Sequence, residues 1–199
     1  PDPDELATAR LEKQRQDLLY DAFRGDLNPA VGAGRNSVHS LKSRNTPKLL
    51  GRTLGGEFYS TSARLGKKYI VVTFWSSKSP ASIAAVRTLA RVSRKLDGEK
   101  VDVVAINIGD DRRRISDSFE TLPENVILLQ ALKPEKKPNA KKEPKTMIET
   151  CKLKILPTSL VIDNSGTTKL VLVGNDRDNA KRLIKRVELL IYDDETADD

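Results

Sequence analysis

The chain has 199 residues, of which 38% are hydrophobic and 32% charged, and its formal net charge is +7. This length suits one domain with appendages, and the lack of an apolar run of about 18 residues argues against a transmembrane segment. The single cysteine, Cys151, excludes an internal disulfide. No cluster of cysteine and histidine occurs, so we expect no metal and no cofactor. The basic charge most often lies on solvated faces, which disfavours nucleic acid as a partner.

The first segment with a clear pattern is residues 4–24, whose apolar spacing predicts an amphipathic helix. Its stripe consists of Leu6, Leu11, Leu18, Leu19 and Phe23, and Gly25 would end it. Such a helix either packs back on the domain or docks a partner, and both interpretations stay open. Residues 25–46 are rich in Gly, Ser and Asn, which predicts a linker. We therefore assign residues 1–46 to an N-terminal helix and a flexible linker.

The stretch from residue 69 to residue 82 predicts a buried strand, a loop and a helix in succession. β-Branched and aromatic side chains fill residues 69–75, which favours a strand. Beyond it, apolar residues recur at helical spacing over residues 80–97, with Ser79 as the expected N-cap and Pro80 as the first helical residue. The loop therefore lies at the carboxyl end of a strand, where open α/β sheets usually place their chemistry.

Shorter strands and helices are expected on both sides of this stretch. Before it, residues 49–60 predict a hairpin with a two-residue Gly55-Gly56 turn. After it, we expect strands over 101–107, 126–129 and 169–173, and a helix over 111–120 capped by Asp110. We also expect a short helix or turn over 146–153, a terminal helix to residue 192, and an acidic tail over 193–199. The alternation of strands and helices predicts an α/β fold, and the family resemblance described below implies a central mixed sheet flanked by helices.

An insertion over residues 133–145 interrupts this alternation. It contains six lysines, two glutamates and three prolines, so it cannot form a core and is expected to be an exposed loop. It is either a solvated loop or a contact for an acidic protein or a membrane surface. RNA is disfavoured because no aromatic side chains are interleaved for stacking on bases. The candidate contacts are Lys133, Lys136, Lys137, Lys141, Lys142 and Lys145.

The segment over residues 74–82, FWSSKSPAS, resembles the active-site segment of thioredoxin-like proteins, above all of the extracytoplasmic TlpA/ResA-like branch, which reads FWASWCPPC. Residues 47–192 take part in the resemblance, including Leu156-Pro157, whose family counterpart is a cis-proline. The resemblance implies a thioredoxin-like three-layer sandwich and a location outside the cytoplasm, periplasmic or lipid-anchored.

The same resemblance places Ser79 and Ser82 on the two redox-active cysteines of the family. Lys78 falls on a tryptophan, and Thr73 on a buried polar residue. An alcohol cannot form or exchange a disulfide, so the position keeps its shape and loses its redox chemistry. Hydrolysis by Ser79 is disfavoured because the only histidine, His39, lies far upstream in the linker.

We therefore expect a redox-inactive domain that binds another protein, an acidic one for the lysine-rich loop, and we expect no enzyme activity. In the family, the active-site loop and the cis-proline loop form a groove that receives an extended substrate. The corresponding residues here are Trp75, Lys78, Ser79, Pro80, Ser82, Leu156 and Pro157.

The alternative is a divergent thiol–disulfide oxidoreductase or peroxidase that uses Cys151, because one thiolate suffices for attack on peroxide. Cys151 follows Met147 and Ile148 at helical spacing, which is more typical of a small buried hydrophobic residue than of a nucleophile.

Overall fold

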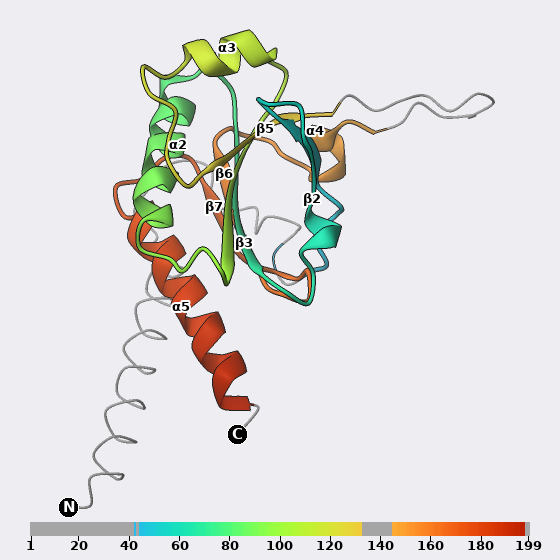
Figure 1. Cartoon of the computed structure of the whole chain (residues 1–199), viewed down its shortest axis with the longest axis vertical. Coiled ribbons are helices and arrows are strands. Elements are labelled where there is room, and N and C mark those ends of the chain that lie inside the picture. The colour runs from blue at the N-terminus through green and yellow to red at the C-terminus, as the bar shows by residue number, and fades with distance from the viewer. Residues whose placement is uncertain (1–41, 43, 133–144, 198–199) are drawn as a thin grey trace, which may run out of the picture.

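The structure is a computed structural model that describes residues 42, 44–132 and 145–197. One seven-stranded sheet runs through it in the order β2-β1-β5-β4-β3-β6-β7 (Figure 1). The strands are β1 Leu50–Thr53, β2 Phe58–Ser60, β3 Tyr69–Trp75, β4 Val101–Asn107, β5 Ile127–Ala131, β6 Thr158–Ile162 and β7 Thr168–Val173. The described helices are α2 Pro80–Ser93, α3 Arg112–Asp117, α4 Met147–Thr150 and α5 Asn179–Ala197, with a 3-10 turn at Thr61–Ala63. The expected α/β fold with a mixed sheet is confirmed.

The central strand β3 is buried along its whole length, as its apolar composition predicts. It pairs in parallel with β4 and antiparallel with β6, and side chains alternate between the two faces of the sheet. Val71 and Trp75 lie in one core, together with side chains of α2 and α5. Ile70 and Phe74 lie in the other core, together with Cys151. Because both faces are covered, neither face of β3 needs polar side chains for water.

The two cores give the molecule its layers. In Figure 1, α2 and α5 cover one face of the sheet, and α4 lies on the other side. The second core is completed by Leu49, Tyr59 and Leu153, which come from segments next to the edge strands and α4. Any group on the α4 side is therefore separated from α2 by the thickness of the sheet.

Two expected boundaries in the first half of the chain differ from the structure. The loop of the first hairpin has three residues, because the Thr53 N–H donates to the Glu57 carbonyl and Arg52 pairs with Phe58. Gly56 ends this loop at a φ of 95°, a left-handed conformation that favours glycine. The predicted two-residue turn is thus wrong. The helix expected over residues 80–97 ends earlier, at Ser93.

Strand β6 covers Thr158–Ile162, directly after the residues that resemble the family's cis-proline. It begins after Pro157, whose preceding peptide bond is cis. Since proline has no N–H to donate, it cannot extend the ladder toward β3.

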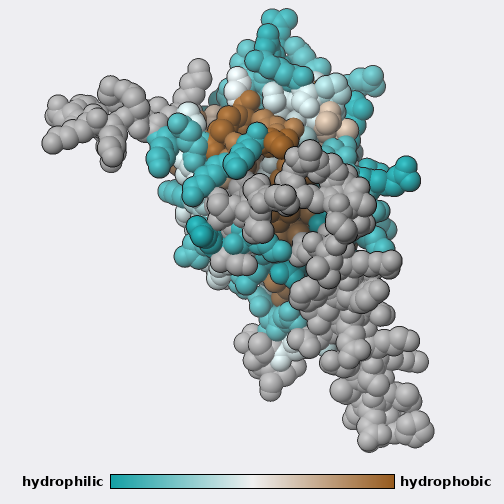
Figure 2. Space-filling model, turned by 180° about the vertical axis from the view of Figure 1, so that it is seen from behind, coloured by the Kyte–Doolittle hydropathy of each residue, from teal (hydrophilic) through white to brown (hydrophobic). Residues whose placement is uncertain are grey.

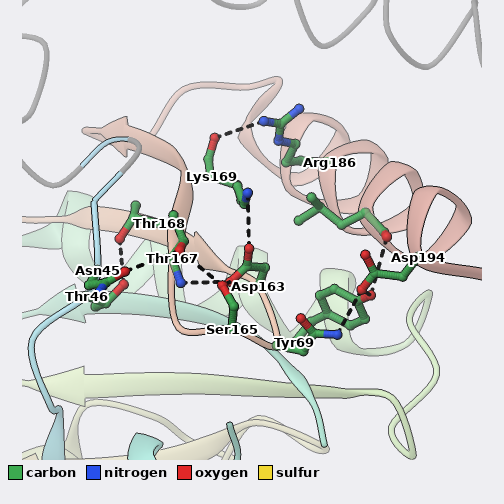
Figure 3. A network of polar contacts seen from close by, with 12 residues as sticks. Asn45, Thr46, Tyr69, Asp163, Ser165, Thr167, Thr168, Lys169, Arg186 and Asp194 are labelled. Atoms are coloured by element: carbon green, nitrogen blue, oxygen red, sulfur yellow. Dashed lines mark hydrogen bonds and ion pairs between the residues drawn. The ribbon is translucent and has the colours of Figure 1, made fainter. Parts of the chain in front are cut away.

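The terminal helix α5 continues through most of the expected acidic tail and reaches Ala197. The Tyr69 hydroxyl donates a hydrogen bond to Asp194, and the Asn164 side-chain amide donates to the same carboxylate at 2.8 Å. Lys100 and Glu195 form an ion pair at 2.5 Å. These partners come from the sheet and its loops, so tertiary contacts extend the helix beyond its apolar stripe. Figure 3 shows Tyr69 next to Asp194.

The folded part also begins slightly before residue 47. Asn45 forms a β-bridge with Thr167, and the Thr46 hydroxyl lies 2.6 Å from that of Thr168 (Figure 3). The predicted helix over 4–24, nearly all of the linker and the lysine-rich loop except Lys145 lie outside the described residues.

Candidate functional site

The candidate site lies at the carboxyl end of β3, where the chain leaves the sheet and turns into α2. Ser79 is the N-cap of α2: its Oγ accepts a hydrogen bond from the Ser82 N–H at 3.3 Å, and Pro80 occupies the first helical turn. Both features agree with the sequence prediction. Ser79 is half-buried, whereas Lys78 and Pro80 are exposed. Three of the expected groove residues therefore reach solvent at least in part.

Ser82 differs from the expectation, because its side chain is fully buried rather than part of a surface turn. Its Oγ has no hydrogen-bond partner among the described protein atoms. Ser82 lies one turn into α2, on the side of the helix that includes the buried Ala85, Val86 and Leu89. Its side chain can therefore pack beneath the surface of the site, but it cannot contact a large ligand directly.

Trp75 is also fully buried and does not line an open surface. Its ring packs against Phe119, with centroids 5.4 Å apart and the planes tilted by 58°. The tryptophan belongs to the core under the site, because the last residue of β3 points to the α2 face. The prediction that Trp75 is a direct binding residue is thus corrected to a supporting role.

A polar pair replaces the buried polar residue that the family carries before the Phe-Trp pair. Thr73 is opposite Ser159 on β6, and their hydroxyls lie 2.7 Å apart in the buried interior. The two hydroxyl groups form a hydrogen bond with each other, so neither needs a charged partner. The pair contains no titratable group that could take up or release a proton near neutral pH.

Asp110 is a site residue that the sequence analysis assigned to a different role. The cap of α3 is Asp111, whose carboxylate accepts from the Arg114 N–H at 2.9 Å. Asp110 is buried, and its Oδ2 accepts hydrogen bonds from the Ser77 N–H and the Asn107 amide, each at 2.8 Å. It therefore joins the loop after β4 to the loop after β3.

Burial by itself would raise the pKa of Asp110, but the hydrogen bonds from Ser77 and Asn107 and the charge of Lys78 lower it below its ordinary value. The other carboxylate oxygen, Oδ1, is buried without a partner among the described protein atoms. Two consecutive aspartates after a strand were the available sequence signal, but the pattern alone does not tell which one is the cap.

Pro157 lies next to the same end of β3. Thr158 pairs with Phe74, so the preceding proline is adjacent to the point where the chain leaves β3. The Leu156–Pro157 bond is cis, Pro157 is buried and Leu156 is half-buried. The Pro157 carbonyl accepts from the Gly174 N–H at 2.8 Å. The structure thus brings the two expected loops to one end of the sheet.

Cys151 lies away from this site, in the core on the opposite face of the sheet from α2. It is fully buried, and burial raises the pKa of its thiol to about 12. Because a thiolate is the reactive form, such a thiol is a poor nucleophile near neutral pH. The sheet therefore separates the cysteine from the helix that begins after Ser79.

The described residues contain no group of three or more His, Cys, Asp or Glu side chains that could hold a metal ion. What remains at the edge is a capped helix N-terminus, a buried carboxylate and half-buried or exposed side chains from two loops.

A family model described as thioredoxin-like matches residues 66–168, which is more than half of the chain. The chain belongs to the thioredoxin-like family. The matched region contains β3, α2 and Pro157, so the site described above lies within the family domain. No curated protein matches the chain significantly in sequence.

Solved structures share this thioredoxin-like fold at low sequence identity. A protein described as a thiol:disulfide interchange protein, DsbE, from Chlorobium tepidum is 18% identical with a TM-score of 0.59, covering 75% of this chain and 97% of that chain. An exposed lipoprotein thioredoxin of Streptococcus pneumoniae is 16% identical with a TM-score of 0.52, covering 74% and 99%. A secreted disulfide oxidoreductase of Mycobacterium tuberculosis is 19% identical with a TM-score of 0.51, covering 71% and 95%. At these low identities, the similarities establish the fold alone.

Proposed function

We propose that this thioredoxin-like domain is redox-inactive and binds an extended segment of another protein at the site edge, by which we mean residues 76–80, 155–157 and 173. The observation that carries the proposal is that positions 79 and 82 hold hydroxyl groups, at the two positions that the resemblance aligns with the family's thiol pair. Since an alcohol cannot exchange with a disulfide, the function that this edge can still perform is binding.

Exposed apolar side chains beside Pro157 support the binding role. Ile155 is 48% exposed, and Val173, which pairs with Thr158, is 43% exposed. Figure 2 shows that apolar side chains reach the surface on the rear of the molecule in a patch surrounded by hydrophilic ones. Apolar side chains that project from neighbouring loops suit a partner with alternate apolar side chains in an extended conformation.

The charge at the edge favours an acidic partner. Lys78 is exposed next to Ser79, and the sequence adds the lysine-rich loop of residues 133–145. A cationic side chain beside an apolar contact steers an anionic partner toward it, and added salt weakens such binding by screening the charges. A membrane surface is the competing acidic partner for the lysine-rich loop.

The proposal includes a location outside the cytoplasm. Its support is indirect: two of the similar structures are described as an exposed lipoprotein and as a secreted protein. Within the described residues, no helix has the length and apolar character to cross a membrane.

Site-specific photo-crosslinking tests the binding role. A photoreactive amino acid at position 78 should form an adduct with a partner, and Ile155→Asp or Val173→Asp in the same chain should abolish that adduct. Glu99→Lys is the control, because Glu99 is exposed in the turn that leads into the amino end of β4, away from the site edge. An adduct that persists after both edge substitutions would contradict binding at this edge.

A second candidate is a thiol-dependent oxidoreductase or peroxidase that uses Cys151, favoured by the activities named for the similar structures. Insulin reduction and peroxide consumption by the wild type and Cys151→Ala decide between the two. Equal background rates support the binding role, whereas turnover that the substitution removes would overturn it.

A further inference from the structure

The inference concerns the outer edge of β7, and it rests on the proposed function because it specifies how the partner binds. β7 is the last strand of the sheet, so one of its edges faces β6 and the other faces away from it. The Gly174 N–H donates to the Pro157 carbonyl at 2.8 Å. The next pair is Val173 opposite Thr158. Because hydrogen-bonding groups alternate along an antiparallel strand, the N–H and C=O of Val173 point away from β6, as do those of Val171.

The first part of this outer edge is already paired with a segment of the same chain. The Thr168 N–H donates to the Arg44 carbonyl at 2.9 Å, and the Thr46 N–H donates to the Gly166 carbonyl at 2.8 Å. Within the described part of the chain, no further backbone hydrogen bond reaches the outward groups of residues 171 and 173. The edge therefore accepts an extended segment at its start and leaves its second half available.

This second half lacks the features that protect an edge strand from pairing. The opposite edge of the sheet, β2, has only three residues, whereas β7 has six. The one lysine of β7, Lys169, lies before the open part and forms an ion pair with Asp163 at 3.1 Å. Residues 170–173 contain only leucine and valine, and Val173 is 43% exposed. Natural sheets use short edge strands, charges and prolines to prevent strand addition, so an edge without them indicates a place where a strand can add.

A cation without a carboxylate partner lies at the same edge. The Lys169 carbonyl accepts a hydrogen bond from the Arg186 guanidinium of α5 at 3.3 Å (Figure 3). The Nε of Arg186 is buried without a partner among the described protein atoms, and none of the ion pairs between described residues includes Arg186. A buried guanidinium N–H without an acceptor is costly, and a carboxylate can accept from two of its N–H groups at once. An acidic side chain therefore suits this position.

We propose that the partner of the site edge adds an extended strand to the outer edge of β7 and that its side chains alternate between apolar and acidic. Side chains of neighbouring strands share the two faces of a sheet. Those beside Val171 and Val173 lie on the face of the second core, and those beside Leu170 and Leu172 lie on the α5 face. Acidic side chains on the α5 face can reach Arg186, and apolar ones on the other face extend the contact at Val173, which belongs to the site edge.

Hydrogen exchange in the free full chain tests whether the edge is open. The amides of Val171 and Val173 should exchange at least about tenfold faster than those of Leu170 and Leu172, which face β6. Equal protection of all four amides would show that the edge is already covered in the free chain, and it would overturn the proposal.

A synthetic peptide of the sequence EVEVEV tests the occupant. At millimolar concentration it should slow the exchange of the Val171 and Val173 amides. Val173→Pro should weaken peptide binding about tenfold, because it removes an outward N–H and leaves the hydrogen bonds to β6 in place. Val173→Thr is the matched control, since it keeps this N–H and should bind like the wild type. A peptide that protects neither amide would overturn strand addition.

A side-chain substitution tests the acidic contact without a change to the backbone. Arg186→Gln should weaken binding of the same peptide about tenfold, because it removes a charge-assisted hydrogen bond. Arg87→Gln removes the same charge from an exposed position on α2 and should leave binding unchanged. Equal binding by both variants would contradict the role of Arg186.

Photo-crosslinking from position 78 separates this inference from the proposed function. Strand addition predicts that Val173→Pro and Arg186→Gln lose the adduct that the wild type forms. An adduct that both variants retain at the wild-type yield would overturn strand addition and leave binding at the site edge intact. Protection of the Val171 and Val173 amides by the peptide, without any adduct in the wild type, would support the strand site and contradict the proposed function.

Discussion

The carboxylate of Asp110 accepts a hydrogen bond from the Ser77 backbone N–H at 2.8 Å, across the gap between two loops of the same sheet edge. The same oxygen accepts from Asn107 at the end of β4. The position of the Ser79 loop therefore depends on a side chain 31 residues later in the sequence. In this domain the site is held by a buried carboxylate and not by a disulfide.

Asp110→Asn should destabilise the fold by about 1–3 kcal/mol at pH 7, because a neutral amide oxygen accepts the two N–H groups more weakly than the ionised carboxylate does. Since the folded-state pKa of Asp110 is lowered, its contribution is present above the ordinary value of 3.8 and is lost as pH falls through the folded value. Urea denaturation at pH 7 and at pH 3 should therefore show that the free energies of unfolding of the variant and the wild type differ less at pH 3.

Asp117→Asn is the matched control for this measurement, since Asp117 is an exposed residue of the adjacent helix α3. It should change the unfolding free energy by less than about 0.5 kcal/mol at either pH. A difference for Asp110→Asn that stays the same at both pH values would contradict the role of the ionised carboxylate.

Ser79→Cys combined with Ser82→Cys should introduce a disulfide that forms under mild oxidation. The two residues flank the first turn of α2, with the Ser79 hydroxyl already next to the Ser82 N–H. Thiol titration in denaturant should find one free thiol after oxidation, that of Cys151, and three after reduction. The single variant Ser79→Cys should keep both of its thiols under the same oxidant. Three free thiols in the oxidised double variant would mean that residues 79 and 82 do not lie together at the start of α2.

Cys151 should resist thiol reagents in the native protein. With a thiol pKa of about 12, only about one molecule in ten thousand carries a thiolate at pH 8, and burial blocks access to it as well. Ellman's reagent should react fully in denaturant and only at the rate of unfolding without it. Rapid labelling of the folded chain would instead place this sulfur at a reactive surface.

Tyr69→Phe should loosen the end of α5, because it removes the hydroxyl that donates to Asp194. We expect a loss of about 1 kcal/mol in the free energy of unfolding and faster hydrogen exchange for amides near residues 192–197. Lys100→Gln is the comparison: because the Lys100–Glu195 pair is exposed, its loss should leave the free energy of unfolding nearly unchanged. Unchanged exchange in Tyr69→Phe would show that the helix end is held by other contacts.

The local features of the site follow from the sequence. A β-branched and aromatic run, followed by a capping serine and a proline, predicts the end of β3 and the start of α2 within a few residues. These preferences depend on near neighbours in the chain, so a single sequence contains them. That Ser79 and Ser82 occupy the positions of the family's cysteine pair stays a prediction from the resemblance.

The tertiary structure decided what each of these side chains faces. Whether Ser82 and Trp75 are exposed, which face of the sheet holds Cys151, and which of two adjacent aspartates caps α3 all depend on contacts between distant segments. The length of α5 depends on Tyr69 and Asn164, which no helical pattern includes. The physical reason is that burial and long-range hydrogen bonds are properties of the packed sheet and its layers, and spacing along the chain does not encode them.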